Sequence, residues 1–552
     1  MLFITVYPLL FIFQGFDITD NGYMATGYHL FFSNPENVSI VFAYWLTCFF
    51  GAVWMAFFGG AGLFGLRIFG VIVTWLTIYF YYRLLTRYAG FGKTAALVSL
   101  SAVLVLTYTY ARMFEYNRLT ALLYAGALYF LCMGLKRNEI INLFVGSSLV
   151  GINFFSRISN ICGVILLIAF AVYILLTRGA LRPRMLGAVA AGMCAGTAAV
   201  FLLMGLLGHT GHFLRALGYY TEIGVNNEMS HDIGGLFRQI MTDNLFAFIY
   251  GGAITIAGCL LLLIVRIIEK KRRFAVMKPA FALCAIILTL GVVFFIENRY
   301  SVNGANTMLV RGINGVCYFF TALSAWNLYK KKLGADTFFL ILTGVLALVV
   351  VPLGSDNGMY NSIFGMWLIV PPVIIEMAKK SRFWAFLVLL ALVTYGFMFS
   401  YSYNFRESVP RTRLVYAMES GKLKWIYTNG ERARLTDEIV SEVKKVVSDN
   451  EKVIIYGAAP MFYYLTDTLP ALDNPWAEIY SYGQFSDVFN KNIISGGLRP
   501  KIALMNFNAN NNDWPAYGPV RDMMRRDIEK FIDENDYYKS SESVMYDIYL
   551  PK

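Results

Sequence analysis

Two acidic residues near the start of the chain are the first candidates for chemistry. Asp17 and Asp20 lie in the stretch GFDITDNGYMATGYHLFF, three positions apart, so on a helical turn their side chains share a face. The first basic residue of the chain is Arg67. A carboxylate beside apolar segments is partly desolvated, and desolvation makes it a stronger base. The pair therefore predicts a general base, and the alternative is a solvated loop with a helix cap.

A second polar group lies between two apolar runs. The stretch from Tyr110 to Arg118 contains Arg112, Glu115 and Asn117. Ionisable groups at the mouth of a helix bundle are unfavourable unless they are paired, which makes them candidates for function. An Arg–Glu pair at the membrane interface is the alternative.

Four further arginines stand at the ends of apolar runs, on the side where acidic residues dominate. They are Arg67, Arg157, Arg299 and Arg311. A guanidinium binds phosphate through two parallel hydrogen bonds, so the set predicts a phosphate site at the membrane surface. The alternative for each is an anchor whose charged end reaches the lipid headgroups.

The remaining candidates are weaker. All four histidines (29, 209, 212 and 231) fall in predicted external loops, and His209 and His212 lack the glutamate of a HExxH zinc site. Asp356 lies in a polar external turn, GSDNGMYN, which predicts either a plain turn or a ligand contact.

The elements that must position these residues are membrane helices. The chain has 552 residues, of which 57% are hydrophobic and 15% charged, whereas a soluble protein has about 25% charged residues. Thirteen apolar segments are long enough, or nearly so, to cross about 30 Å of hydrocarbon. They lie at 2–14, 63–82, 94–111, 118–135, 140–156, 160–177, 185–207, 245–265, 279–296, 312–329, 337–353, 363–378 and 383–400.

The charge distribution predicts how these segments are oriented. Six loops between alternate segments hold 20 basic and four acidic residues, and the other loops hold eight basic and ten acidic residues. The excess of Lys and Arg places the six loops in the cytoplasm and residues 401–552 outside. The net charge of +12 thus reports membrane topology and excludes nucleic-acid binding. Residues 39–58 are predicted to lie in the outer interface or to re-enter, ended by Gly59–Gly62, and a fourteenth span is the alternative.

The last 150 residues differ from the rest. A helix is predicted at 436–448, strands at 452–456 and 501–507, a helix from Pro519 to about 534, and a hairpin over 537–550. The fold class is therefore an all-α polytopic membrane bundle of about 13 transmembrane helices over 1–400, with an external loop at 15–62. A small extracytoplasmic α/β domain follows at 401–552.

Residues 15–93 contain an external acidic motif ending in Asp20–Tyr23, a predicted surface helix, a span that opens with Arg67, and the basic turn Arg83–Arg87. With this order of motifs, the segment resembles the GT-C superfamily of integral-membrane glycosyltransferases, in particular the branch of aminoarabinose and protein-mannosyl transferases. Asn21 stands where this family often has a second acid. In the next outer loop, Arg112 with Glu115 or Asn117 takes the place of an Arg–Asp pair.

The resemblance implies an inverting sugar transfer from a polyprenyl-phosphate donor at the outer face of a membrane, expected to be the bacterial inner membrane. Asp20 is the expected base, with Asp17 and Glu115 as further catalytic candidates. Other external-cavity candidates are Tyr23, His29, Asn117 and Asp356. The donor phosphate is expected on Arg67, Arg112, Arg157, Arg299 and Arg311. A divalent metal ion is compatible with the acids but is not required, and the acceptor is a glycan, lipid or protein.

Two other classes of protein stay open. A polysaccharide polymerase or ligase also uses external arginines, although the early acidic loop and the C-terminal α/β domain are not typical of it. A transporter would be expected to show internal repeats and ionisable residues within its spans. In this chain the charges stand at the ends of the apolar segments.

Overall fold

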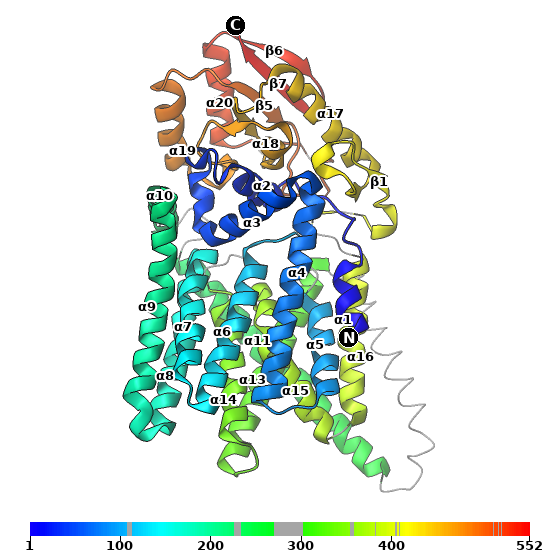
Figure 1. Ribbon diagram of the computed structural model, residues 1–552. Coiled ribbons are helices and arrows are strands. Elements are labelled where there is room, and N and C mark those ends of the chain that lie inside the picture. The colour runs from blue at the N-terminus through cyan, green and yellow to red at the C-terminus, as the bar shows by residue number, and fades with distance from the viewer. Residues whose placement is uncertain are drawn as a thin grey trace.

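The computed structural model describes residues 1–107, 113–225, 233–269, 302–353, 358–380, 382–402, 406–407, 409–511, 513–516, 518–519 and 521–552. A bundle of apolar helices forms one end of the molecule, and a small domain with a mixed sheet forms the other (Figure 1). Short helices from the first 60 residues lie between them (Figure 1). The predicted combination of a helical bundle and a small C-terminal α/β region is confirmed.

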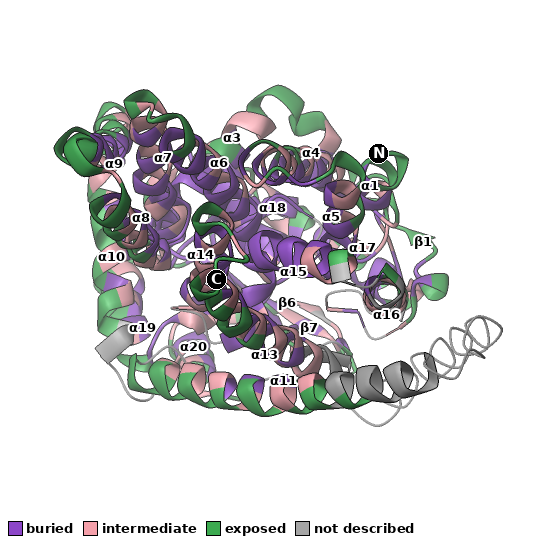
Figure 2. Ribbon diagram, turned by 90° about the horizontal axis from the view of Figure 1, so that it is seen from below, coloured by how far each residue is buried: buried purple, intermediate pink, exposed green. Residues whose placement is uncertain are grey.

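The bundle helices are α4 (Gly62–Arg83), α5 (Lys93–Thr107), α6 (Tyr116–Arg137), α7 (Ile140–Asn153), α8 (Val164–Thr177), α9 (Arg182–Leu206), α11 (Ile233–Glu269), α13 (Val302–Tyr329), α14 (Ala335–Val350), α15 (Met366–Lys380) and α16 (Arg382–Ser402). Most of them follow the predicted apolar segments, but α11 and α13 begin 12 and 10 residues before the segments predicted at 245–265 and 312–329. In the view along the bundle, α15 is buried at the centre, whereas α9, α10 (Thr210–Val225) and α11 lie at the rim with exposed outer faces (Figure 2).

Several of these helices could cross a membrane. Within the described residues, five helical segments are long and apolar enough, or six if one bent pair counts as a single span. Four shorter apolar helices of 10–17 residues accompany them. The chain is therefore a multi-pass membrane protein, while the predicted number of about 13 spans is not confirmed. Segment 279–296 lies outside the described residues.

The first predicted span is wrong. Residues 2–14 form a five-residue helix, α1 (Leu2–Val6), and a single 3-10 turn, η1 (Tyr7–Leu9), before the chain bends at Phe11 with φ +62°. Pro8 is the second residue of this turn, and Leu10, which follows it, has left the helical conformation. A helix of five residues is about 7.5 Å long, far short of the hydrocarbon thickness.

Three elements from the external loop form a layer over the bundle. They are α2 (Asp20–Leu30), η2 (Pro35–Tyr44) and α3 (Trp45–Phe58). The chain then turns through η3 (Gly59–Ala61), where Gly62 has φ +52° and a Cβ on it would overlap the carbonyl of Lys422. The glycine break predicted after residue 58 is thus present. Helix α4 begins at this break and runs into the bundle (Figure 1).

The C-terminal domain contains a five-stranded sheet in the order β4-β3-β5-β7-β6. Strands β4 (Leu469–Pro470), β3 (Lys452–Tyr456) and β5 (Lys501–Met505) are parallel, whereas β7 (Tyr546–Pro551) is antiparallel to β5 and to β6 (Tyr537–Glu542). A second pair joins β1 (Tyr416–Ala417) and β2 (Tyr427–Thr428). The predicted strands at 452 and 501 and the closing hairpin are confirmed.

The domain's helices are α17 (Gly430–Val446), α18 (Met461–Thr466), α19 (Tyr482–Phe489) and α20 (Met523–Glu534). Two predicted helix starts are wrong. Helix α17 begins six residues before Thr436, because the Asn429 side chain accepts from the Arg432 amide and caps the helix there. Helix α20 begins after its cap Asp522, rather than at Pro519.

The carboxyl ends of the parallel strands face the layer over the bundle. After β3, the Met461 amide donates to the carbonyl of Ile18 in the first loop. At the end of β4, the Asn37 side chain of η2 donates to the Pro470 carbonyl at 2.9 Å. One buried core joins residues of α2, α3 and α4 with residues of β3 and β5, so the domain and the bundle pack as one body.

The basic turns and the C-terminal domain lie at opposite ends of the bundle. The turn between α4 and α5 and the turn between α13 and α14 are both at the end remote from the domain (Figure 1). Basic turns favour the cytoplasmic side. We therefore expect a reporter enzyme that works only outside the cytoplasm to be active when fused after Lys552. Activity there of a reporter that works only in the cytoplasm would contradict this topology.

Candidate functional site

Asp17 and Asp20 have different environments, although they are only three residues apart. The Asp17 carboxylate is 2% exposed and accepts hydrogen bonds from the Thr19 amide at 3.0 Å, the Thr19 hydroxyl at 2.6 Å and the Asn21 amide at 2.8 Å. These bonds satisfy amides at the start of α2 that would lack helical partners. Asp17 therefore stabilises the start of α2. That Asp17, as the second candidate after Asp20, acts as a base stays a prediction.

Asp20 is the accessible acid of the first loop. It is the first residue of α2, its side chain is 42% exposed, and its carboxylate lies 3.8 Å from the guanidinium of Arg406. Arg406 follows the last bundle helix and begins the C-terminal domain. Asp20 thus stands where the bundle, the first loop and the domain meet, with a carboxylate that solvent can reach.

Glu115 brings a second carboxyl group to the same place. It is the residue before α6 and is 5% exposed, and its Oε1 has no hydrogen-bond partner among the described residues. Burial raises the pKa of the Glu115 carboxyl to about 7, with a further increase from Asp20, while Arg118, Asn117 and Arg157 act in the opposite direction. Asp20 and Glu115 are therefore electrostatically coupled across α2 and α6.

Two arginines accompany these acids. Arg157 lies at the break between α7 and α8, is 8% exposed, and has its guanidinium 5.6 Å from the centre of the Tyr116 ring. The Tyr116 ring stacks on Tyr44 at 4.5 Å. Arg118 donates to the Met113 carbonyl at 3.1 Å and to the Thr74 hydroxyl at 2.8 Å. The cluster of Asp20, Glu115, Arg118 and Arg157 is called the acid–arginine site below.

A small cavity lies on the bundle side of the acid–arginine site. Its volume is about 30 Å³, which is enough for one or two water molecules. Glu115 and Arg118 line it together with three threonines and two aromatic side chains, which are Thr74, Thr77, Thr107, Phe364 and Trp367; Ala121 completes the lining. Buried polar groups thus converge in this part of the bundle.

Three of the other predicted cavity residues are in the described part of the chain. Asn117 is buried and hydrogen-bonded to Glu115. The ring of Tyr23 lies 6.0 Å from that of Trp476 in an edge contact, and burial raises the pKa of its hydroxyl. His29 instead lies 3.1 Å from Asp467, which also pairs with Lys422, so it joins α2 to the domain at a different place.

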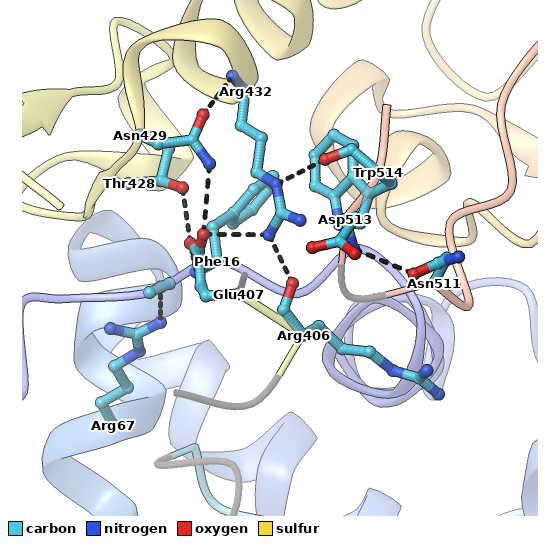
Figure 3. A network of polar contacts seen from close by, with 11 residues as sticks. Phe16, Arg67, Arg406, Glu407, Thr428, Asn429, Arg432, Asn511, Asp513 and Trp514 are labelled. Atoms are coloured by element: carbon cyan, nitrogen blue, oxygen red, sulfur yellow. Dashed lines mark hydrogen bonds and ion pairs between the residues drawn. The ribbon is translucent and has the colours of Figure 1, made fainter. Parts of the chain in front are cut away.

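The arginines predicted to bind phosphate are not all gathered in one place. Arg67 is 3% exposed and donates to the backbone carbonyls of Ile12 at 2.7 Å, Gln14 at 3.2 Å and Gly15, so it holds the first loop (Figure 3). Arg311 pairs with Asp243 of α11. Arg112, Arg299 and Asp356 lie outside the described residues. Of the predicted set, the structure brings Arg157 to the two acids, and phosphate binding by the others stays a prediction.

Sequence reasoning missed a network that fixes the first loop to the C-terminal domain. Arg432 and Glu407 are both fully buried and form an ion pair at 2.9 Å. Glu407 also accepts from the Phe16 amide at 3.0 Å, and Arg432 donates to the Trp514 carbonyl at 2.8 Å. Figure 3 shows these groups around the first loop, close to Arg406. The network thereby fixes the segment that leads into Asp20.

The signals for the missed residues differ. Arg118 stands three positions after Glu115, so the helical spacing places both side chains on one face, and this pattern is visible in the sequence. Arg406, Glu407 and Arg432 have no such pattern, because their partners are about 400 residues away or in another element. In the described part of the chain, no three His, Cys, Asp or Glu residues gather as a ligand set for a metal ion.

No protein-family model matches the chain, and no curated protein does. The solved structures that are similar to it include ArnT from Cupriavidus metallidurans bound to undecaprenyl phosphate and the same protein in the apo state. Each match covers 99% of this chain and 97% of the other, with 12% sequence identity and a TM-score of 0.43. ArnT is an aminoarabinose transferase of the GT-C superfamily.

Proposed function

We propose that the chain is an inverting glycosyltransferase that moves a sugar from a polyprenyl-phosphate donor to an acceptor hydroxyl at the outer face of the membrane. The observation that carries the proposal is the acid–arginine site. Two carboxyl groups and two guanidinium groups from separate elements meet there, between an apolar bundle and a domain outside it. A lipid-linked donor needs both surroundings, because its isoprenoid chain is apolar and its phosphate is charged.

Asp20 is the proposed general base. Its carboxylate is accessible, whereas Asp17 is enclosed by hydrogen bonds to its own loop. In the proposed step, Asp20 takes the proton of the acceptor hydroxyl as that oxygen bonds to the anomeric carbon of the sugar. The bond from this carbon to the phosphate oxygen breaks, and the phosphate leaves with the electron pair. Attack from the face opposite the phosphate inverts the anomeric configuration.

The arginines stabilise the leaving phosphate. As the bond breaks, negative charge grows on the phosphate, and guanidinium groups held in a largely buried site stabilise that charge strongly. Arg157 is held against the Tyr116 ring, and Arg118 is fixed by a carbonyl and a hydroxyl. Both groups are thus oriented before the donor arrives.

Replacement of Arg157 by lysine tests this role. Lysine keeps the positive charge but loses the planar pair of donors, so we expect the KM for the lipid donor to rise about tenfold, with the KM for the acceptor unchanged. The check is initial-rate kinetics of the purified protein with varied donor. Arg137→Lys is the matched control, because Arg137 is an exposed residue at the far end of α6. Normal donor use by Arg157→Lys would remove Arg157 from the phosphate site.

A divalent ion is a separate question for the same site. Carboxylate oxygens are the ligands that hard cations prefer, and Asp20 and Glu115 are the residues that would hold one. Treating the purified protein with a chelator and then adding back Mg²⁺ or Mn²⁺ decides it. If the chelator abolishes activity and the added ion restores it, the site binds a divalent ion. If the chelator leaves activity unchanged, the arginines alone stabilise the phosphate.

The two alternative functions give different products in one assay. In detergent there are no separate compartments, so a transporter yields no new covalent product, whereas a glycosyltransferase still transfers the sugar. A polymerase or ligase would add a preformed glycan or build a ladder of repeats rather than a single sugar. Mass spectrometry of the acceptor after incubation with polyprenyl-phosphate sugars therefore separates the three classes.

A further inference from the structure

A charged pair lies inside the helical bundle, away from the acid–arginine site. Asp243 of α11 is 3% exposed and accepts from both the Nε and an Nη of Arg311 on α13, with the Nε contact at 3.1 Å. The guanidinium also covers the Phe246 ring, with 5.0 Å between the charged carbon and the ring centre. Ionisable residues within a membrane bundle are unfavourable and are retained where they have a function.

Asp243 has a second partner that is not needed to pair the two helices. Its other carboxylate oxygen accepts from the backbone amide of Met359 at 2.8 Å. Met359 belongs to η8 (Gly358–Phe364), a 3-10 segment that precedes α15. Gly358 has φ +51°, and a Cβ there would overlap the Asp243 carboxylate. The glycine thus permits the close approach of the carboxylate to η8.

η8 is the first half of a bent pair of helices. It meets α15 at an angle of 69° and packs against α5, α11, α13 and α14. A second bond holds it to α13, because the Asn314 side chain donates to the Ser362 hydroxyl at 2.6 Å and both residues are fully buried. A break between two helices within a membrane bundle is tolerated where protein surrounds it or where it lines a cavity. η8 is packed among other helices, and its last residue, Phe364, lines a cavity.

The far end of η8 reaches the cavity beside the acid–arginine site. Phe364, its last residue, and Trp367, at the start of α15, line that cavity together with Glu115 and Arg118. A shift of η8 therefore moves the wall that faces Glu115 and Arg118. Misplacement by about 1 Å at a distance from the chemistry can lower a rate by about 10²-fold.

We propose that Asp243 is a positioning residue for the acid–arginine site. Arg311 fixes the Asp243 carboxylate, and the carboxylate in turn fixes η8, which forms one wall of the cavity beside Glu115 and Arg118. This inference rests on the proposed function. It differs from a merely structural ion pair because it requires the link from Asp243 to Met359, in addition to the link between the helices.

Exchanging the two charges separates these links. Asp243→Arg combined with Arg311→Asp restores an ion pair between α11 and α13, but arginine has no acceptor for the Met359 amide. We expect this double variant to fold, to bind undecaprenyl phosphate at least about tenfold more weakly than the wild type, and to lose amide-exchange protection over 358–364. Binding is measured on the full-length protein in detergent with undecaprenyl phosphate as the probe, and exchange is measured without lipid.

A matched control is present in the same helix pair. The Tyr318 hydroxyl of α13 donates to the Asn244 side chain of α11 at 2.7 Å, and this bond joins α13 to α11 rather than to η8. Tyr318→Phe removes a tie between the helices only, so both lipid binding and exchange at η8 should stay at wild-type values. Equal losses in this variant would show that helix pairing alone is responsible and would overturn the proposal.

Two milder variants keep the test decisive if the charge exchange fails to fold. Gly358→Ala pushes the Asp243 carboxylate away from Met359, and Ser362→Ala removes the second tie of η8. Both should weaken lipid binding and raise exchange over 358–364. Wild-type lipid affinity in both, with exchange raised, would overturn the positioning role. If the wild type itself binds no undecaprenyl phosphate, the donor class in the proposed function fails instead.

Discussion

Asp20→Asn is expected to lower kcat for sugar transfer by about 10²–10⁴-fold, the range associated with loss of a general base. Asparagine has nearly the same shape and cannot accept the acceptor proton. Because Asp20 is partly exposed and its contact with Arg406 is long, the variant should melt at the wild-type temperature. The measurement is the rate of transfer from a polyprenyl-phosphate sugar at saturating donor and acceptor, alongside a thermal melt.

Asp17→Asn is the matched control for this prediction. The asparagine oxygen can still accept the two bonds from Thr19, whereas its NH2 group cannot accept from the Asn21 amide. One of the three bonds is lost, so the start of α2 should survive with a loss of about 1–3 kcal/mol of stability. Its kcat should stay within a few-fold of the wild type. The reverse result, an inactive but folded Asp17→Asn with an active Asp20→Asn, would transfer the role of base to Asp17.

Glu407→Ala is expected to be the most destabilising single replacement in the domain interface. It leaves the Arg432 charge buried without its carboxylate partner and removes the acceptor of the Phe16 amide. Breaking a buried ion pair by deleting one partner costs about 3–5 kcal/mol. That is a large part of a typical total stability of about 5–15 kcal/mol. We therefore expect a much lower melting temperature, and loss of transfer because the first loop is released.

Two comparisons make this prediction specific. Glu442→Ala removes a surface partner of Lys445 and should change stability by less than about 1 kcal/mol. The double replacement of Glu407 and Arg432 by apolar residues removes both buried charges, and it should recover part of the stability without recovering full activity. A Glu407→Ala variant that melts like Glu442→Ala would show that the network does not hold the interface.

Local sequence patterns predicted the helices and strands well. The apolar runs mark α4 to α9 because a segment surrounded by lipid must satisfy its backbone internally, and this requirement is visible in composition alone. The run at 2–14 has the same apolar composition, and it was therefore wrongly predicted to be a span. Composition cannot show that its backbone carbonyls accept hydrogen bonds from Arg67 and from the Tyr427 amide. The start of α17 was missed because Thr436 and Asn429 are both suitable caps, and tertiary packing selects between them.

The candidate site was predicted only in part. Asp20, Glu115 and Arg157 stood out because each is a charged residue at the end of an apolar run, where charge is unusual. Sequence could not show that Asp17 is occupied by its own loop, or that Arg311 is held by Asp243, because both facts depend on distances between side chains. The Arg432–Glu407 pair was invisible for the same reason.

The bonds between the first loop and the C-terminal domain bear on how the chain matures. The Thr26 hydroxyl donates to the Pro460 carbonyl across 434 positions, and the Phe16 amide reaches Glu407 across 391. During synthesis the loop leaves the ribosome hundreds of residues before its partners exist, and at about 5–20 residues per second it waits some tens of seconds for them. The segment carrying Asp20 therefore acquires its final contacts only after the C-terminal domain has been made and has folded. An unfinished or C-terminally truncated chain would hold its apolar helices in the bilayer without an ordered first loop, so the proposed sugar transfer would begin only once the C-terminal domain has folded.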